Sequence, residues 1–153
     1  MKYNIPEVWE IEIENIVLDL NWTLSVKWEI PKWVRERLDK LKDLWMKILL
    51  LTGDQRGTAN ILSSELWINF KKAKTAEEKW DCMEELDCEK TASIWNARID
   101  IETFKKAKLS IATLQGEWIH PEIIPYVDII VTHINDALDI LIDWDSLSAT
   151  MRT

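Results

Sequence analysis

The sequence predicts a three-layer α/β fold with a doubly wound parallel sheet, and three observations support this prediction. Short apolar segments alternate with amphipathic segments along the 153 residues, which is typical of βαβ units. Several apolar segments lack polar alternation, as expected of strands buried on both faces. Polar residues directly follow several of these segments, where open α/β sheets form their sites. We therefore expect one Rossmann-like domain over residues 1–153, with about six parallel strands and helices on both faces.

The first half of the chain predicts three strands and two helices. The apolar run 16–18 is the first buried strand, and segment 32–44 is a helix because apolar side chains recur on one face. A strand over 47–51, a helix over 58–66 and a brief strand over 68–70 follow. The segment 9–13 should add an antiparallel edge strand before the first buried strand, because only Glu14 and Asn15 remain for the turn.

The second half continues the alternation of helices and strands. Thr75 and Glu78 form a capping box, a pattern that opens a helix. The remaining expected strands are 91–94, 109–113 and 128–132, and the remaining expected helices are 100–107, 121–127 and 135–142. No insertion after the first or third strand is long enough for a large cap domain.

Composition and charge exclude several classes of partner. The formal net charge of -8 lacks the phosphate-neutralising surface of a nucleic-acid binder. No apolar run approaches the roughly 20 residues of a membrane span, and the first residues lack the apolar core of a signal peptide. We therefore expect a cytoplasmic protein without nucleic-acid or membrane partners. The spacing of Cys82 and Cys88 matches no zinc pattern, so we expect two reduced thiols.

The chain has an abnormal balance of glycine and tryptophan. It contains three glycines and ten tryptophans, whereas average usage of about 7% would give roughly 11 glycines. The helix-to-strand junctions "DLWMKI", "ELWINF" and "ELDCEK" place Trp45, Trp67 and Asp87 at the helix C′ position, which favours left-handed backbone and therefore glycine. Eight tryptophans stand at such junctions or turns: Trp9, Trp22, Trp28, Trp33, Trp45, Trp67, Trp95 and Trp118.

The simplest hypothesis is that these eight tryptophans are misread glycines. A genetic code in which UGA means glycine would produce this exchange if it were translated with a table in which UGA means tryptophan. Trp80 and Trp144 lie at helical or helix-start positions and fit as real tryptophans. The alternative is a tryptophan-rich surface used for binding, which does not explain the simultaneous loss of glycine.

Polar residues at three strand ends suggest a site for phosphoryl chemistry. Asp19, Thr52 and the segment with Asn96 and Asp100 all follow strands whose carboxyl ends adjoin in a doubly wound sheet. Mg²⁺ prefers oxygen ligands and keeps several waters. The carboxylates of Asp19 and Asp100 with the backbone carbonyl of Asn21 would therefore suffice as protein ligands.

Three motifs together resemble the haloacid dehalogenase superfamily, in particular its small soluble members that are similar to the phosphorylation domain of P-type ATPases. They are "DLNWT", read as D-x-N-G-T, then "LLTGD", and "IWNARID", read as I-G-N-x-R-x-D. The resemblance implies an aspartyl-phosphate on Asp19 and Thr52 binding the phosphoryl oxygens. It also implies Mg²⁺ held by Asp19, Asn21, Asn96 and Asp100, and a lysine that neutralises the phosphoryl group. Lys79 best matches that lysine, and Lys72 and Lys74 are rivals.

Some residues depart from the family pattern or have simpler explanations. Asn21 stands where family phosphatases usually carry an aspartate as general acid and base, and an amide cannot transfer a proton. Ile99 replaces a polar residue in the last motif. Lys79 could be a solvated helix charge, and Asp54 could merely cap the next helix. His120 and His133 lie outside all motifs and are expected at the surface or in packing.

The function expected from these residues is a Mg²⁺-dependent phosphohydrolase or phosphotransferase with an open site. Its substrate would be a phosphorylated small molecule or macromolecule, and a neighbouring subunit of a homo-oligomer could cover the site. The rival is a non-catalytic binding or regulatory module, favoured by Asn21 and Ile99. A receiver-type phosphoacceptor domain would need paired acidic residues near the first strand's start, which Glu14 and Asn15 match poorly.

The misreading hypothesis makes a direct prediction about the gene. The codons for Trp22, Trp45, Trp67 and Trp95 should be UGA, and sequencing the gene checks this. UGG at all four positions would end the hypothesis.

Overall fold

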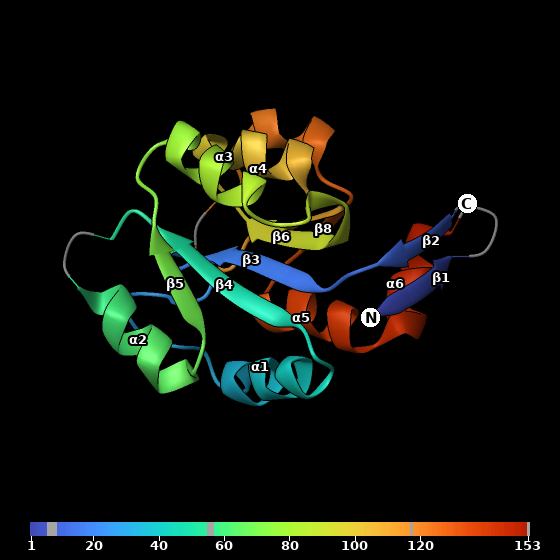
Figure 1. The fold of residues 1–153 in the computed structure, drawn as a ribbon, viewed down its shortest axis with the longest axis horizontal. Coiled ribbons are helices and arrows are strands. Elements are labelled where there is room, and N and C mark those ends of the chain that lie inside the picture. Colours follow the sequence, from blue (N-terminus) through green and yellow to red (C-terminus); the bar gives the residue numbers. More distant parts are fainter. Residues whose placement is uncertain (6–8, 55–56, 117, 153) are drawn as a thin grey trace.

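The computed structural model describes residues 1–5, 9–54, 57–116 and 118–152, and its centre is a six-stranded parallel sheet (Figure 1). The strand order is β5-β4-β3-β6-β7-β8, so the chain winds outward in both directions from β3. This confirms the predicted doubly wound sheet. The strands are β3 (Asn15–Asp19), β4 (Lys47–Thr52), β5 (Asn69–Lys72), β6 (Thr91–Trp95), β7 (Leu109–Thr113) and β8 (Ile129–Val131).

Helices cover both faces of this sheet (Figure 1). One face carries α1 (Val34–Asp43), α2 (Thr58–Leu66) and α5 (Ile134–Ile142), and the other carries α3 (Ala76–Glu84), α4 (Ile101–Lys106) and the 3₁₀ segment η3 (Pro121–Tyr126). Two further 3₁₀ turns are η1 (Cys88–Lys90) and η2 (Arg98–Asp100). Within the described ranges, no helix is both long and apolar enough to span a membrane.

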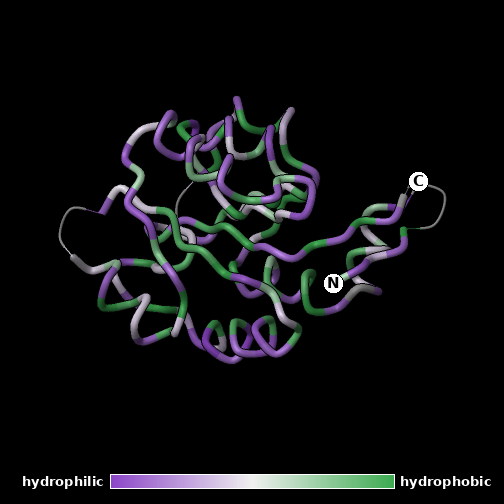
Figure 2. Tube along the Cα trace, in the orientation of Figure 1, coloured by the Kyte–Doolittle hydropathy of each residue, from purple (hydrophilic) through white to green (hydrophobic). Residues whose placement is uncertain are grey.

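Alternating side chains of each strand feed two separate cores, because successive residues of a strand point to opposite faces. Leu18 and Ile94 pack in the core on the α1 and α5 side, whereas Val17 and Leu51 pack in the core on the α3 and α4 side. In Figure 2 the hydrophobic colour runs along the central strands, and the helices alternate between hydrophobic and hydrophilic positions. Burial on both faces explains why the strand sequences are continuously apolar.

The amino-terminal segment corrects one prediction. Trp9–Glu12 forms β2, which pairs antiparallel with β1 (Lys2–Ile5) in a separate two-stranded sheet rather than at the edge of the main sheet. An additional helix, α6 (Trp144–Met151), packs on β1, and the Tyr3 hydroxyl donates to the Leu141 carbonyl at 2.7 Å. The hairpin thus buries its apolar face against the carboxyl-terminal helices at one end of the molecule (Figure 1).

The predicted capping box at the start of α3 is confirmed. The Thr75 hydroxyl accepts the Glu78 backbone N–H at 3.1 Å, and the Glu78 carboxylate accepts the Thr75 N–H at 3.2 Å. This cap satisfies two otherwise unpaired backbone donors. It fixes the first turn of α3, from which Lys79 reaches the interior of the protein.

Five of the eight suspect tryptophans have left-handed backbone. The φ angles are 61° at Trp22, 72° at Trp28, 72° at Trp33, 64° at Trp45 and 54° at Trp67. Left-handed backbone costs an L-residue roughly 1–2 kcal/mol, whereas glycine adopts it freely. The structure therefore requires glycine-like geometry at these five positions. Trp95 differs, because it ends β6 in extended conformation.

The junctions after α1 and α2 are Schellman motifs with tryptophan at C′. Met46 N–H donates to the Leu41 carbonyl at 3.0 Å, and Ile68 N–H donates to the Ser63 carbonyl at 3.0 Å. A hydrogen bond from a backbone N–H to the carbonyl five positions earlier is the signature of the Schellman motif. The C′ residue of this motif is usually glycine. The third junction differs from the prediction, because Asp87 has a φ of -73° and leads into η1 instead.

Changing Trp45 or Trp67 to glycine should stabilise the protein. Relief of left-handed strain should add roughly 1 kcal/mol for each change and raise Tm by about 2–4 °C. Both indoles are exposed, at 90% and 81%, so little packing is lost. Calorimetry measures the shift.

Trp80→Gly is the matched control, because Trp80 lies inside α3. Glycine there should lower stability by about 1 kcal/mol and remove the contact with the Lys106 ammonium, which lies 3.3 Å from the indole centroid. A fall in Tm for Trp45→Gly and Trp67→Gly would mean that tryptophan belongs at both positions.

Candidate functional site

The candidate site lies at the carboxyl ends of the central strands, where the winding direction reverses. β3 pairs with β4 on one side and β6 on the other. Asp19 ends β3, Thr52 ends β4, and Asn96 follows β6. Doubly wound sheets bind ligands at this switch point, because the two neighbouring connections leave it on opposite faces of the sheet.

Asp19, Lys79 and Asp100 form a charged cluster at this edge. The Lys79 ammonium forms an ion pair with Asp100, and both side chains are almost fully buried, at 4% and 1% exposure. Asp19 retains partial exposure and feels the charges of both other residues. The fold therefore brings together three of the residues expected from the sequence, from β3, α3 and η2.

The environment of the two carboxylates disfavours two negative charges. Burial raises the pKa of Asp19 to about 7; the Lys79 ammonium opposes this rise and the Asp100 carboxylate adds to it. Burial also raises the pKa of Asp100, again against the effect of Lys79. Asp100 forms the ion pair with Lys79, and Asp19 is a second carboxylate close to the same ammonium, so the cluster carries an unbalanced negative charge, which a divalent cation would relieve.

The donor set at this edge suits Mg²⁺ better than a transition metal. Within the residues that the structure describes, no group of three or more His, Cys, Asp or Glu side chains gathers into a metal site. Two carboxylates supplemented by a backbone carbonyl and water are a usual arrangement for Mg²⁺. Asp19, Asp100 and the Asn21 carbonyl remain the candidate ligands.

Asn96 is buried beside the loop that follows β3. Its side-chain carbonyl accepts the Thr23 hydroxyl at 3.5 Å, and only 1% of the residue is exposed. Asp100 is held in the same turn, because its carboxylate accepts the Ala97 backbone N–H at 3.1 Å. Asn96 therefore links the loop after β3 to the loop after β6. Ile99, in the same turn, is 41% exposed.

The loop after Asp19 is tightly hydrogen-bonded. Leu24 N–H donates to the Asp19 carbonyl at 3.2 Å, and Ser25 N–H donates to the Leu20 carbonyl at 2.8 Å. The Trp22 N–H in turn donates to the Ser25 carbonyl at 2.8 Å. These bonds hold the loop in one conformation next to the nucleophile candidate.

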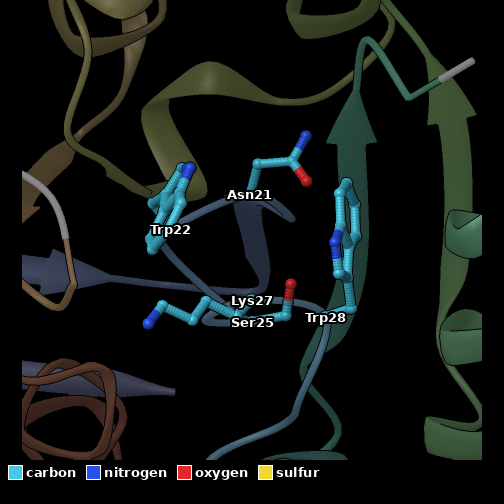
Figure 3. Close-up of a pocket in the computed structure, with 5 residues that line it drawn as sticks. All are labelled: Asn21, Trp22, Ser25, Lys27 and Trp28. Carbon is cyan, nitrogen blue, oxygen red and sulfur yellow. The ribbon is translucent and has the colours of Figure 1, made fainter.

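A hollow of about 290 Å³ opens beside this loop (Figure 3). Trp22 and Trp28 stand on opposite sides of it. The residues that line it are Asn21, Trp22, Ser25, Lys27 and Trp28. Ser25 and Lys27 are not among the site residues predicted from the sequence, although the sequence placed the neighbouring Trp28 in a turn.

Thr52 and Asp54 shape the end of β4. Thr52 is fully buried, and its hydroxyl oxygen accepts the Asp54 backbone N–H at 3.1 Å. The Asp54 carboxylate accepts the Ala59 N–H at 2.8 Å in the first turn of α2. Asp54 thus has the capping role that the sequence left open, and Thr52 lies one residue beyond the register partner of Asp19.

Trp95 lies in the core on the α3 and α4 side and contacts the Lys79 ammonium of the charged cluster. Its indole is fully buried, and the Lys79 ammonium lies 4.2 Å from the ring centroid. The indole N–H is buried without a hydrogen-bond partner in the part of the chain that the structure describes. An unpaired buried donor costs roughly 1–3 kcal/mol. Trp95 is therefore anomalous for a reason independent of backbone strain.

The rival lysines and the two histidines lie outside the cluster. Lys72 and Lys74 are exposed, whereas Lys79 is buried, so Lys79 is the lysine that the fold brings to the carboxylates. His120 accepts the Glu122 N–H at the start of η3, and His133 accepts the Asn135 N–H at the start of α5. Both histidines thus cap helices.

Solved structures share this fold over nearly the whole chain. A cobalt-bound deoxy-D-mannose-octulosonate 8-phosphate phosphatase from Haemophilus influenzae has a TM-score of 0.73 and 15% identity, covering 93% of this chain and 94% of its own. The corresponding phosphatase from Moraxella catarrhalis, in complex with magnesium, phosphate and KDO, has a TM-score of 0.69 and 15% identity over 90% and 92%.

A putative hydrolase of the haloacid dehalogenase (HAD) family from Streptomyces avermitilis has a TM-score of 0.70 and 15% identity, over 87% of this chain and 84% of its own. No protein-family model matches this sequence, and no curated protein matches it. At these identities the likeness establishes the fold, which is the three-layer fold of HAD-family hydrolases.

Replacing Trp22 and Trp95 by glycine should open the site to a phosphate mimic. Removal of the Trp95 indole would leave the Lys79 ammonium facing a cavity, and glycine at position 22 would clear the loop beside Asp19. Together with the other six glycine changes, this should restore Mg²⁺-dependent binding of beryllofluoride, measured by titration calorimetry. The protein that keeps all ten tryptophans should bind beryllofluoride far more weakly.

Trp118→Gly is the control, because the Trp118 side chain is 87% exposed. This change alone should leave beryllofluoride binding unaltered. Equal binding by the printed and the eight-glycine chains would show that the indoles do not obstruct the site.

Proposed function

We propose that this protein is a Mg²⁺-dependent phosphohydrolase of the HAD type that forms an aspartyl-phosphate on Asp19. The observation that carries the proposal is the cluster of Asp19, Lys79 and Asp100 at the switch point of a HAD-like sheet. The neighbouring phosphatases support it, because metal ions are bound to two of them. The closer likeness to P-type ATPase domains rests on the sequence motifs.

Each residue has a role that follows from its position. The Asp19 residue is less buried than Lys79 and Asp100, and its carboxylate attacks phosphorus. The Lys79 ammonium neutralises the phosphoryl oxygens, and Thr52 donates a hydrogen bond to them. Preorganised charges and donors of this kind stabilise the transition state of phosphoryl transfer.

Asp19, the Asn21 carbonyl and Asp100 would hold Mg²⁺, with Asn96 supporting Asp100 and the loop. The cation would supply charge neutralisation between the carboxylates and the phosphoryl group. The Lys79 ammonium is paired with Asp100. To contact the phosphoryl oxygens, it would have to turn from Asp100 toward the substrate.

A phosphorylated small molecule is the substrate class that the neighbours favour, because one neighbour is in complex with phosphate and KDO. A location in the cytoplasm and self-association that covers the open site are further expectations of this proposal. A non-catalytic binding module is the second candidate, and one observation favours it: the Trp95 indole fills the space beside Lys79 in the printed sequence.

Turnover of p-nitrophenyl phosphate with Mg²⁺ tests the proposal. Asp19→Asn should lower kcat/KM by about 10³-fold or more, because the nucleophile is lost. Asp19→Asn should keep the fold, since it removes a charge from a site that disfavours charge. Turnover is measured in the printed and eight-glycine chains, with and without chelator.

Asp128→Asn is the matched control, because Asp128 is another carboxylate whose pKa burial raises, but it lies beside Ser110 at the start of β7. It should leave kcat unchanged. Absence of turnover in both chains, or turnover that survives Asp19→Asn, would favour the binding module.

A further inference from the structure

We infer that the outer edge of β8 is a self-association surface, at which β8 pairs antiparallel with β8 of a second copy of this chain. β8 ends the strand order at one side of the sheet, and β7 is its only neighbouring strand among the described residues. An edge strand presents unpaired backbone N–H and C=O groups, which are a template for another strand. The inference goes beyond the proposed function, because β8 carries none of the candidate site residues.

The two edges of the sheet differ in their protection against such pairing. At the other edge, β5 carries Lys71 and Lys72, and Lys71 forms an ion pair with Glu85. Charged side chains on an edge strand, lysine above all, oppose pairing with another chain. β8 consists of two isoleucines and a valine. The fold therefore protects the β5 edge and leaves the β8 edge open to a partner strand.

Ile130 gives the β8 edge an exposed apolar side chain. Its neighbours Ile129 and Val131 are buried in the core on the α1 and α5 side. Successive residues of a strand point to opposite faces, so Ile130 points away from that core, and it is 49% exposed. In an antiparallel pair about a two-fold axis, the Ile130 side chains of the two copies can lie opposite each other on one face of a continuous sheet.

The surface beside β8 is apolar as well. Leu114 follows β7, and its N–H donates to the Val131 carbonyl at 3.0 Å. Ile124 and Tyr126 belong to η3, the segment that leads into β8. Leu114, Ile124 and Tyr126 are all exposed. A single exposed apolar side chain is common, whereas several around one unpaired strand edge are typical of an interaction surface.

The sequence of β8 is compatible with pairing to itself. With Ile130 opposite Ile130 of the second copy, Ile129 faces Val131, and Asp128 faces Thr132. Like charges directly opposite each other destabilise a strand pair, and this register contains none. The second copy therefore fits the edge in the register that also brings the two exposed isoleucines together.

The protected β5 edge explains why the pairing should stop at two copies. Pairing of β8 with β5 of a next copy would be a head-to-tail contact, which builds open assemblies unless it closes into a ring. Lys71 and Lys72 oppose that contact. Pairing of β8 with β8 uses the same surface on both copies and closes on itself. Because β8 is only three residues long, we expect an interface below the standard size of roughly 1,600 Å² and a weak dimer.

Sedimentation over a range of protein concentrations tests the pairing. We expect a reversible equilibrium between monomer and dimer, both in the protein that keeps all ten tryptophans and in the eight-glycine protein. Ile130→Lys gives β8 the kind of side chain that protects β5, so it should raise the dimer Kd about tenfold or more. Ile61→Lys is the matched control, because Ile61 is an exposed isoleucine on α2, and it should leave the Kd unchanged.

Cross-linking tests the position of the two-fold axis. Ile130→Cys is placed in a Cys82→Ser, Cys88→Ser background, so that it carries the only thiol. A short bismaleimide should join two copies of this variant, because directly opposite Cβ atoms lie roughly 4.5–5.5 Å apart. Ile61→Cys in the same background should not be joined. This test remains decisive if Ile130→Lys does not fold.

The outcomes separate β8 pairing from other kinds of contact. An unchanged Kd in folded Ile130→Lys, or no cross-link through Ile130→Cys, would overturn the inference. A monomer at every concentration would also overturn it and would leave the β8 edge to a strand of a different protein. A dimer that is lost in the eight-glycine protein would assign the contact to exposed indoles, and open-ended assemblies would contradict a closed pair. The proposed function is tested by turnover and does not depend on these results.

Discussion

The closeness of two carboxylates to one buried ammonium, which pairs with only one of them, is the constraint on which the site depends. Lys79 reaches Asp100 from α3 across the carboxyl edge of the sheet, and Asp19 lies within range of both charges. A buried ion pair is weak evidence for stability, because desolvation opposes the attraction. The capping box that fixes α3 and the turn that holds Asp100 therefore serve to position charges. This is the arrangement that chemistry on a dianionic phosphoryl group requires.

The positions of most elements could be predicted because hydrophobic period decides them, and the alternation of strands and helices predicted the doubly wound class of the sheet. β7 occupies the predicted range 109–113, and α2 occupies 58–66. The amino-terminal hairpin could not be predicted in the same way, because Glu14 and Asn15 looked sufficient for a turn into β3. The pairing of β2 with β1, and the burial of both against α6, depend on contacts far apart in sequence. Local pattern cannot carry such information.

In the candidate site, as in the fold, some features could be predicted from the sequence and others needed the structure. Asp19, Thr52 and Asp100 are expected together because strand ends of a parallel sheet adjoin. The family resemblance favoured Lys79 and left Lys72 and Lys74 as rivals, and side-chain burial in the structure now separates the three lysines. The sequence also did not predict that Lys27 lines the hollow. The position of Lys27 depends on the turn between Val26 and Glu29, which returns the chain to the loop after Asp19.

The tryptophans connect the fold to the function through two independent physical arguments. Backbone geometry marks Trp22, Trp28, Trp33, Trp45 and Trp67, since all five have left-handed φ angles. Trp95 has extended backbone and is marked instead by a buried, unpaired indole N–H against the Lys79 ammonium. A surface evolved for binding would explain exposed indoles, but it would not place them at Schellman C′ positions or bury one against the Lys79 ammonium. Glycine satisfies both conditions, because it adopts left-handed backbone without strain and has no side chain to fill the space beside Lys79.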